Sequence, residues 1–556
     1  MIATSFRRLL PPALALAIGL LTALPPLVIS GFEETPGGRD TQLVNYALEH
    51  SYRFLQQHPL HHDFWDPPIF YPARNVAAYT DTLLSLAPFY WPWRTLGLAP
   101  DSAFQVWLVI MWALNFLAFY LYLRRIFGLG ETGAAAGAFL FAFGSSRAAN
   151  VLHPQLIPAF FLVAALYALH RAFDSELPRR WRQGWILAFF LALTAQAWGA
   201  VYPAFFFALL TGLALLAALT SRPARARFGS FLRDGAPALV AGALVAAVLT
   251  APLAARYRVT AETHGVRTWE DVEPFQPRWV SWMLMGTTHR LWGWLYDTEL
   301  TAEGRFLRTA NHANGLGLIA LAVAGIGLYR HRRLPAVRLM VMASLLAILL
   351  TTVFPGGFTF WRLVYENLPG AAAIRAVGRI GLLLLIPAGL GVGWFFESRR
   401  GPWWQTAAIL LLLIVEQAHA PAAYDKLEAR RRAQAIAEAV GADCRSFFVT
   451  TTATHPGIHE DAMWAGILAG VPTVNGRYGN FPPGWTLYDK AYRRRDDASQ
   501  DGAAAALGAW LEHNCLAAED VCRIDSPVPG EAVGRQQIAD VKAASPSCAG
   551  SRGLAR

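Results

Sequence analysis

The chain has 556 residues and a formal net charge of +10, with 54% hydrophobic and only 15% charged residues. Soluble globular proteins usually carry about 25% charged residues. The composition therefore excludes a disordered chain and argues against a water-soluble enzyme. The positive charge leaves nucleic acid or a membrane as a partner, and the position of the arginines decides between them.

Long apolar stretches recur along the chain, and a membrane-spanning helix needs about 20 such residues. The first follows Arg7 and Arg8 and is too long for the apolar core of a signal peptide, so we expect a retained helix. We predict eleven spans, at residues 9–29, 102–123, 132–146, 156–169, 185–200, 202–219, 236–255, 315–329, 337–354, 380–396 and 403–415. The stretch 132–146 is rich in glycine and alanine, which would let neighbouring helices approach closely.

Arginines gather in alternate loops of this arrangement. With the N-terminus in the cytoplasm, every short inner loop is basic, as the positive-inside rule requires. The long loops 31–101, 256–310 and 355–378 and the tail from residue 420 then lie outside. We therefore expect a multi-pass protein of the cell (inner) membrane that binds the lipid bilayer and no nucleic acid. The predicted domains are residues 1–419, in the membrane, and 420–556, outside it.

All four cysteines lie in the tail, at Cys444, Cys515, Cys522 and Cys548. An even number in one polar segment predicts disulfides and an oxidising compartment. Three pairings are possible, and reduced buried thiols are the alternative. No Cys-x-x-Cys spacing supports a zinc site.

The tail has the pattern of a small α/β domain, with a strand at 445–450, a helix at 459–469 and a strand at 471–475, which suggests a parallel pair. Polar groups at the end of such strands often bind ligands. Candidate binding residues are His459, Asp461, Asn475 and Tyr478, and ordinary turn structure is the alternative.

The first outer loop contains several acids that could act as a general base at the membrane surface, namely Asp40, Asp66 and Asp81. Each could instead cap or support a helix; Asp40 precedes a predicted helix that starts at Thr41. The histidines and aspartates of residues 58–66 have the composition of a metal site, but their spacing matches no coordination motif. We therefore predict no metal ligands and no certain cofactor, with a divalent metal as a remote alternative.

Several short motifs occur in a characteristic order, namely Gly38-Arg39-Asp40, Phe70-Tyr71-Pro72, Tyr79-Thr80-Asp81, Gly137-Ala138-Phe139, His153-Pro154-Gln155, Leu368-Pro369-Gly370, Ile374-Arg375-Ala376 and Arg379. In this order the chain resembles bacterial GT-C-type integral-membrane glycosyltransferases over most of residues 1–400. The resemblance implies a polytopic α-helical membrane protein, a lipid-phosphate-linked sugar donor and a catalytic acid in the first outer loop. Asp40 is the residue here that matches this acid. Arg39 stands where related chains often have glycine, and no Asp-x-Asp pair occurs.

The chemistry that the resemblance implies assigns roles to further residues. Asp40 would be the base, with Asp66 and Asp81 in reserve. Arg375 and Arg379 would bind the departing phosphate, because an arginine fork matches phosphate geometry; anchoring at the membrane interface is their alternative. His153 would bind substrate or cap a helix.

We therefore expect a polytopic GT-C-like protein with a small extracytoplasmic α/β tail. The expected activity is hexosyl or pentosyl transfer from a polyprenyl-phosphate donor to a glycan, lipid or protein acceptor of the cell envelope. A transporter or flippase of lipid-linked glycans would need charged residues deep within its spans, which are nearly free of them. A non-catalytic envelope assembly protein is the third alternative.

Overall fold

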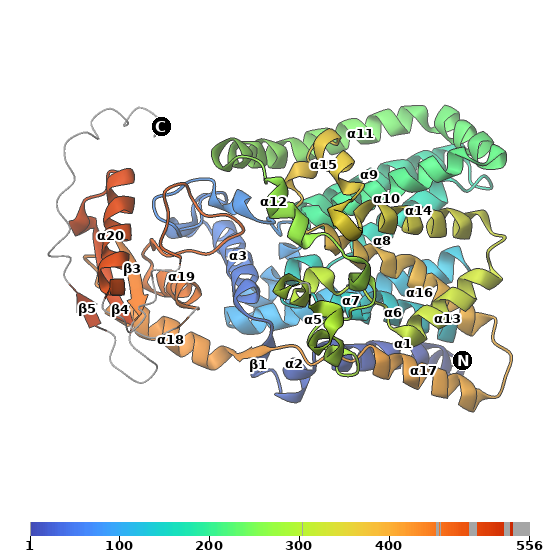
Figure 1. Cartoon of the computed structure of the whole chain (residues 1–556), viewed down its shortest axis with the longest axis horizontal. Coiled ribbons are helices and arrows are strands. Elements are labelled where there is room, and N and C mark those ends of the chain that lie inside the picture. The colour runs from blue at the N-terminus through green and yellow to red at the C-terminus, as the bar shows by residue number, and fades with distance from the viewer. Residues whose placement is uncertain are drawn as a thin grey trace.

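The computed structural model describes residues 2–302, 304–451, 455, 457–488, 498–526 and 534–536. These residues form twenty α-helices and five short strands. The long helices make a bundle at one end of the molecule, and the C-terminal helices and strands form a smaller body at the other end (Figure 1). Helix α3 (Arg39–Leu55) lies between the two parts.

A helix forms at each of the eleven predicted apolar stretches. They are α1 (Ile2–Ala23), α5 (Pro100–Ile126), α6 (Glu131–Phe143), α8 (Phe160–Ala172), α9 (Arg179–Gly199), α10 (Val201–Leu219), α11 (Arg222–His264), α13 (Leu318–Arg330), α14 (Pro335–Thr351), α16 (Gly381–Glu397) and α17 (Trp403–Glu416). Five of the described helices are long and apolar enough to cross a membrane by length and composition. The number of crossings stays a prediction.

Two helix boundaries differ from those expected. The first helix ends at Ala23, and α2 (Pro25–Ile29) follows a break at Leu24. Proline disfavours helical geometry in the residue before it, which explains the break. Helix α11 is 43 residues long and far exceeds the predicted stretch 236–255. The flanking segments are rich in alanine and arginine, which are strong helix formers, so the helix continues beyond its apolar part.

Glycine allows two helices of the bundle to come into close contact. A Cβ atom on Gly137 of α6 would lie 2.5 Å from the carbonyl oxygen of Gly389 in α16, and one on Gly389 would lie 2.7 Å from the carbonyl oxygen of Gly137. Neither position leaves space for a side chain. The expected close approach of the glycine- and alanine-rich helix is therefore confirmed.

The predicted first outer loop (residues 31–101) is tied to the start of the predicted tail (residues 420–556). Strand β1 (Glu34–Pro36) pairs antiparallel with β2 (Ala423–Asp425), directly before α3 begins. The outer loops also carry the short helices α4 (Trp91–Thr95), α12 (Trp269–Val272) and α15 (Trp361–Asn367).

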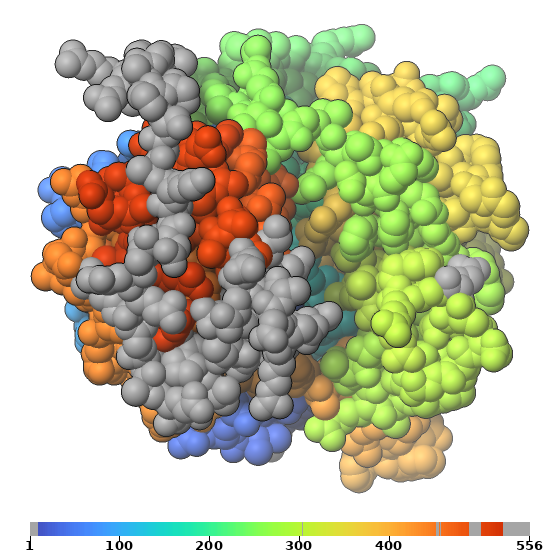
Figure 2. Space-filling model, turned by 60° about the vertical axis from the view of Figure 1, so that its left-hand side comes forward, coloured from blue at the N-terminus to red at the C-terminus, as the bar shows by residue number. Residues whose placement is uncertain are grey.

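The C-terminal part contains α18 (Lys426–Ala439), β3 (Ser446–Thr451), α19 (Ile458–Ala469), α20 (Ala498–His513), β4 (Val521–Ser526) and β5 (Gly534–Gln536). Strand β4 is central; it pairs parallel with β3 and antiparallel with β5. In the space-filling view this orange and red part stands beside the green second outer loop (Figure 2).

The predicted parallel pair is present, but its second strand is a different segment. Residues 471–475 form only a single bridge, between Thr473 and Phe447, and β4 is the partner of β3. Pro472 has no N–H to donate to a ladder, and the N–H of Thr473 donates to the carbonyl of Pro68 in the first outer loop. This segment therefore joins the tail to the outer loop.

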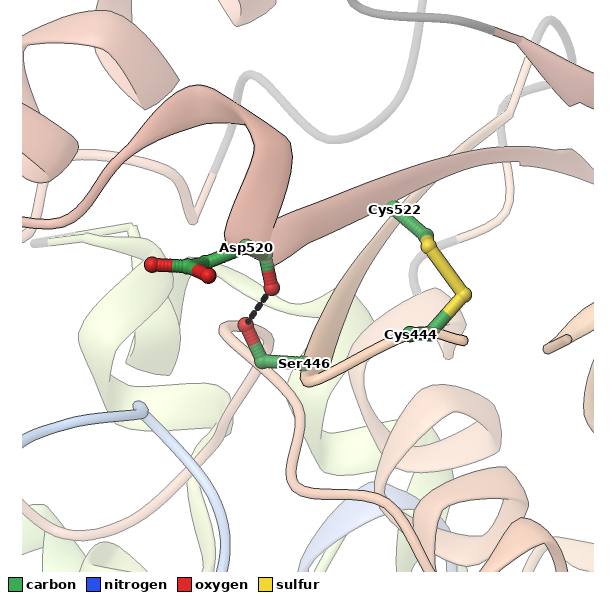
Figure 3. Close-up of a disulfide and its surroundings, with 4 residues drawn as sticks. All are labelled: Cys444, Ser446, Asp520 and Cys522. Atoms are coloured by element: carbon green, nitrogen blue, oxygen red, sulfur yellow. Dashed lines mark hydrogen bonds between the residues drawn. A yellow bond between two sulfur atoms is a disulfide. The ribbon is translucent and has the colours of Figure 1, made fainter. Parts of the chain in front are cut away.

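The tail contains the expected disulfides. Cys444 is bonded to Cys522, beside a hydrogen bond from the Ser446 hydroxyl to the Asp520 carbonyl (Figure 3). Cys515 is also disulfide-bonded, and Cys548 lies outside the described residues.

One hydrophobic core is shared by the tail and the first outer loop. Phe447 and Trp510 of the tail are buried in the same cluster as Tyr46 of α3 and Phe70. The ring of Tyr46 also meets that of Trp464 edge to face, with centroids 5.8 Å apart. The two segments consequently support each other.

Candidate functional site

Asp40 lies in the first turn of α3, where the positive end of the helix dipole favours a carboxylate. Its Oδ1 atom is 2.5 Å from Nη2 of Arg477, and its Oδ2 atom is 3.2 Å from Nε2 of His153. The side chain is 29% exposed. Asp40 is therefore held at a partly open site between the helical bundle and the tail.

His153 belongs to the turn that follows the short helix α7 (Ser145–Ala148), and its N–H donates to the Asn150 carbonyl. Burial lowers the pKa of His153 to about 4; Arg379 lowers it further and Asp40 opposes the shift. The ring is consequently neutral at pH 7. Because a carboxylate can only accept, the tautomer with the proton on Nε2 is the one that suits this 3.2 Å contact.

Two arginines complete the surroundings of His153. Arg379 lies over the ring of Tyr202, 4.5 Å from its centroid, and its Nε donates to Oδ1 of Asn311. The backbone N–H of Arg375 donates to the Tyr202 hydroxyl. Arg375, Arg379 and Arg477 all act electrostatically on His153. Asp40, Arg375 and Arg379 thus lie close enough to His153 to act on it electrostatically, and their roles in substrate binding and catalysis stay predictions.

Arg477 is the member of this cluster that sequence reasoning missed. Its Nη1 donates to the Tyr488 hydroxyl at 3.1 Å, and the same hydroxyl accepts from Arg39 at 2.7 Å. The only signal in the sequence was its place in the glycine- and proline-rich loop 475–485, between the candidate binding residues Asn475 and Tyr478.

The other two candidate catalytic acids of the first outer loop, Asp66 and Asp81, have structural partners. Asp66 binds Nη1 of Arg74 and the backbone N–H of Asn75, both at 2.7 Å. Asp81 accepts a hydrogen bond of 2.9 Å from the N–H of Val201, the first residue of α10. Burial raises the pKa of Asp81, while this bond and the charge of Arg379 oppose the rise. A catalytic role for either acid stays a prediction.

The candidate residues of the tail are buried and bonded within it. His459 donates to the Tyr488 carbonyl, and Asp461 binds Arg432 at 2.8 Å. Asn475 accepts from the N–H of Val449 and donates to its carbonyl. The Tyr478 side chain is buried in the shared core. These contacts shape the loop that presents Arg477, and direct substrate binding by the four residues stays a prediction.

Within the described part of the chain, no three His, Cys, Asp or Glu side chains come together as a metal site. In the histidine-rich segment, Nδ1 of His61 lies 2.8 Å from Nδ1 of His50, and His62 bonds the Pro59 carbonyl.

An apolar groove of about 640 Å³ runs along α10 from Phe205 to Leu219. Phe228 of α11 and the Leu368-Pro369 segment line its other side. The groove begins one turn after Tyr202, which contacts both Arg375 and Arg379. Its lining is almost entirely apolar, which suits a hydrocarbon chain.

No protein-family model and no curated protein matches this sequence. Among solved structures, the arabinofuranosyltransferase AftD from Mycobacteria aligns with 93% of this chain and 35% of its own, at 16% identity and a TM-score of 0.54. The chain has a GT-C-type fold. The archaeal oligosaccharyltransferase AglB from Archaeoglobus fulgidus aligns over 94% of this chain and 69% of its own, with 13% identity and a TM-score of 0.48. ArnT from Cupriavidus metallidurans aligns over 95% and 94%, with 15% identity and a TM-score of 0.43.

The GT-C fold and the apolar helices together make this an integral membrane protein. The chain spans about a third of the length of AftD, 35%. What it acts on has therefore to be argued from its own site.

Proposed function

We propose that this GT-C protein is a membrane glycosyltransferase that moves a sugar from a polyprenyl-phosphate donor to a cell-envelope acceptor. The observation that carries the proposal is a partly exposed carboxylate, Asp40, near a group of arginines, with an apolar groove along the helix that carries Tyr202. Such a site combines a base, an anion-binding region and a place for a lipid.

In the proposed reaction, the acceptor hydroxyl oxygen attacks the anomeric carbon of the donor sugar. Asp40 takes the hydroxyl proton as the new C–O bond forms. The bond between the sugar and the phosphate oxygen breaks, and polyprenyl phosphate leaves with the electron pair. A single direct displacement of this kind inverts the anomeric carbon.

Arg375 and Arg379 stabilise the phosphate, whose negative charge grows in the transition state. Tyr202 holds both arginines at the outer end of α10, through its hydroxyl and its ring. The lipid tail then lies in the groove along α10. Tyr202 and the Asn311 side chain hold these arginines, and neither arginine forms an ion pair with a carboxylate among the described residues, so their charge is available to an anion.

We place the site on the extracytoplasmic side. The arginines of the predicted short inner loops support this orientation, and so does the Cys444–Cys522 disulfide of the tail, because disulfides form in oxidising compartments.

The proposal is tested with purified protein in liposomes that contain a panel of synthetic undecaprenyl-phosphate hexoses and pentoses, with an envelope glycan fraction as acceptor. Release of undecaprenyl phosphate reports transfer of any sugar. Asp40→Asn keeps the shape of the side chain and removes the base, so we expect at least about a hundredfold loss of rate.

The matched control is Asp297→Asn in the second outer loop, where the carboxylate side chain is 74% exposed and pairs with Arg308. This variant should release undecaprenyl phosphate as fast as the wild type. Full activity of Asp40→Asn would overturn Asp40 as the base. No release from any donor by the wild-type protein would overturn the function.

A further inference from the structure

The bond between Asp40 and Arg477 joins residues 437 positions apart in the chain. Arg477 comes from the tail, whereas Asp40 belongs to the first outer loop. The tail therefore places a cation directly on the proposed base, where its charge affects how readily Asp40 takes a proton.

The loop that carries Arg477 is held tightly against the first outer loop. The N–H of Phe70 donates to the Asn475 carbonyl at 3.1 Å. A Cβ atom on Gly476 would lie 2.5 Å from the Phe70 ring, and one on Gly479 would lie 2.5 Å from the Tyr79 carbonyl oxygen. The backbone on both sides of Arg477 is thus fixed by contacts that only glycine permits, and its guanidinium is presented at a defined place.

Arg477 has a second carboxylate partner, Glu460, in the first turn of α19. Nη1 of Arg477 lies 3.2 Å from Oε1 of Glu460, whose side chain is 1% exposed. Neither carboxylate oxygen of Glu460 has a hydrogen bond among the described residues. The guanidinium is therefore shared between an exposed acid, Asp40, and a buried one.

The charges that face Glu460 come from three elements. Helix α3 contributes Arg39, and the loop contributes Arg477, which also binds Asp40. On α19 itself, Asp461 is occupied by Arg432 of α18 and by His455. Tyr488 accepts from both Arg39 and Arg477. Burial raises the pKa of Glu460 to about 7, against the opposing charges of Arg477 and Arg39.

We propose that Glu460 is a positioning residue that acts through Arg477 and controls how strongly the tail holds Asp40. The proposal rests on the function of Asp40 as the base. When Glu460 is ionised, Arg477 is shared between two carboxylates and Asp40 is freer to take a proton. When Glu460 is neutral, the whole guanidinium charge acts on Asp40, which becomes a weaker base.

The test compares transfer by the wild type and by Glu460→Gln, a neutral side chain of the same shape, in the undecaprenyl-phosphate sugar assay. In the wild type, kcat should rise between about pH 6 and 8 as Glu460 ionises. In Glu460→Gln, kcat should lack this rise and be about tenfold lower at pH 8, with KM changed less than about twofold. A pH profile identical to that of the wild type would overturn the inference.

Two arginine variants show that the effect passes through Arg477. Arg477→Gln should remove the same rise, because no guanidinium then links Glu460 to Asp40. Arg445→Gln is the matched control, because Arg445 is a 78% exposed arginine of the tail that pairs with Asp520. If the control changes the pH profile as much as Arg477→Gln does, the assignment to Arg477 is wrong.

The outcomes separate this inference from the proposed function. If Asp40→Asn remains active, the proposed function fails, and the inference fails with it. If Asp40→Asn is inactive but Glu460→Gln matches the wild type at all pH values, only the inference fails.

A second measurement needs no donor. Because the pKa of folded Glu460 lies at about 7, above its usual 4.5, its proton stabilises the folded state at low pH. This stability is lost as the pH rises from about 4.5 to 7. The melting temperature of the wild type should therefore fall relative to Glu460→Gln over that range. If the two melting temperatures differ by the same amount at every pH in this range, Glu460 does not titrate between pH 4.5 and 7.

Discussion

His153 is the residue on which the charges of the site converge. Its Nε2 lies 3.2 Å from Oδ2 of Asp40, and its Nδ1 is buried without a partner among the described residues. A protonated ring would place a fourth positive charge beside Arg375, Arg379 and Arg477. Burial and these cations keep the ring neutral, so it faces Asp40 as a polar neighbour without adding to the positive charge.

This role predicts different effects for two substitutions of His153. The amide of His153→Gln can still donate to Asp40, whereas His153→Ala leaves a carboxylate without that donor. Loss of a hydrogen bond to a charged group corresponds to about a tenfold lower rate or more. Liposome transfer assays should therefore show a slow His153→Ala and a largely active His153→Gln. Equal rates for both variants would contradict the role.

His153 also predicts how stability depends on pH. Its pKa is about 4 in the folded protein and 6.5 for an unperturbed histidine, so the unfolded chain binds the proton more readily. The associated stability is complete above about pH 6.5 and is lost as the pH falls towards 4. The melting temperatures at pH 5 and pH 7 should therefore differ less for His153→Gln than for the wild type.

At the scale of elements, the start of α10 depends on a residue far away in the chain. The side chain of its N-cap residue, Ala200, makes no hydrogen bond. The Asp81 carboxylate instead accepts one from the N–H of Val201. The same helix carries Tyr202, against which Arg375 and Arg379 rest. The first outer loop therefore positions the proposed phosphate-binding arginines through α10.

Asp81→Ala should destabilise this junction by about 1 kcal/mol, the usual cost of losing a helix cap. Asp81→Asn retains an oxygen that can accept from Val201, so its melting temperature should remain closer to that of the wild type. Its rate of undecaprenyl phosphate release should also be close to wild type. A folded but inactive Asp81→Asn would instead show that the carboxylate takes part in the chemistry.

At the scale of the whole molecule, the tail and the first outer loop form one structural unit. They share a hydrophobic core, and Trp510 donates to the Tyr71 carbonyl across the junction. The Cys444–Cys522 disulfide closes a segment of 78 residues that contains both Glu460 and Arg477. Loss of order in the tail should consequently disturb Asp40.

Replacing Cys444 and Cys522 by serine removes this restraint on the unfolded chain. For a closed loop of this size, the chain-entropy model gives a loss of about 4.5 kcal/mol. Thermal unfolding followed by protease digestion of the tail should show a lower midpoint, and transfer should be lost at the same temperature. An unchanged midpoint, or transfer that outlasts tail digestion, would contradict this coupling.

The sequence alone determined the features that depend on local composition. The length of each apolar stretch and the arginines between them predicted the helices of the bundle, because a membrane span needs only a continuous run of apolar residues. The predicted helix boundaries were wrong at the end of α1, where a proline breaks the helix after Ala23. They were also wrong in α11, where strong helix formers extend the helix beyond the apolar stretch. The ordered motifs predicted the GT-C fold, and the clustered cysteines predicted disulfides.

Only the tertiary structure decided which polar residues meet. Asp40 and Arg477 are separated by 437 positions, and Asp81 caps a helix that begins at Val201. No periodicity or spacing encodes such contacts, because packing of the tail against the outer loop creates them. The same packing buries Asn475 and His459 and directs Arg477, their neighbour in the tail, towards Asp40.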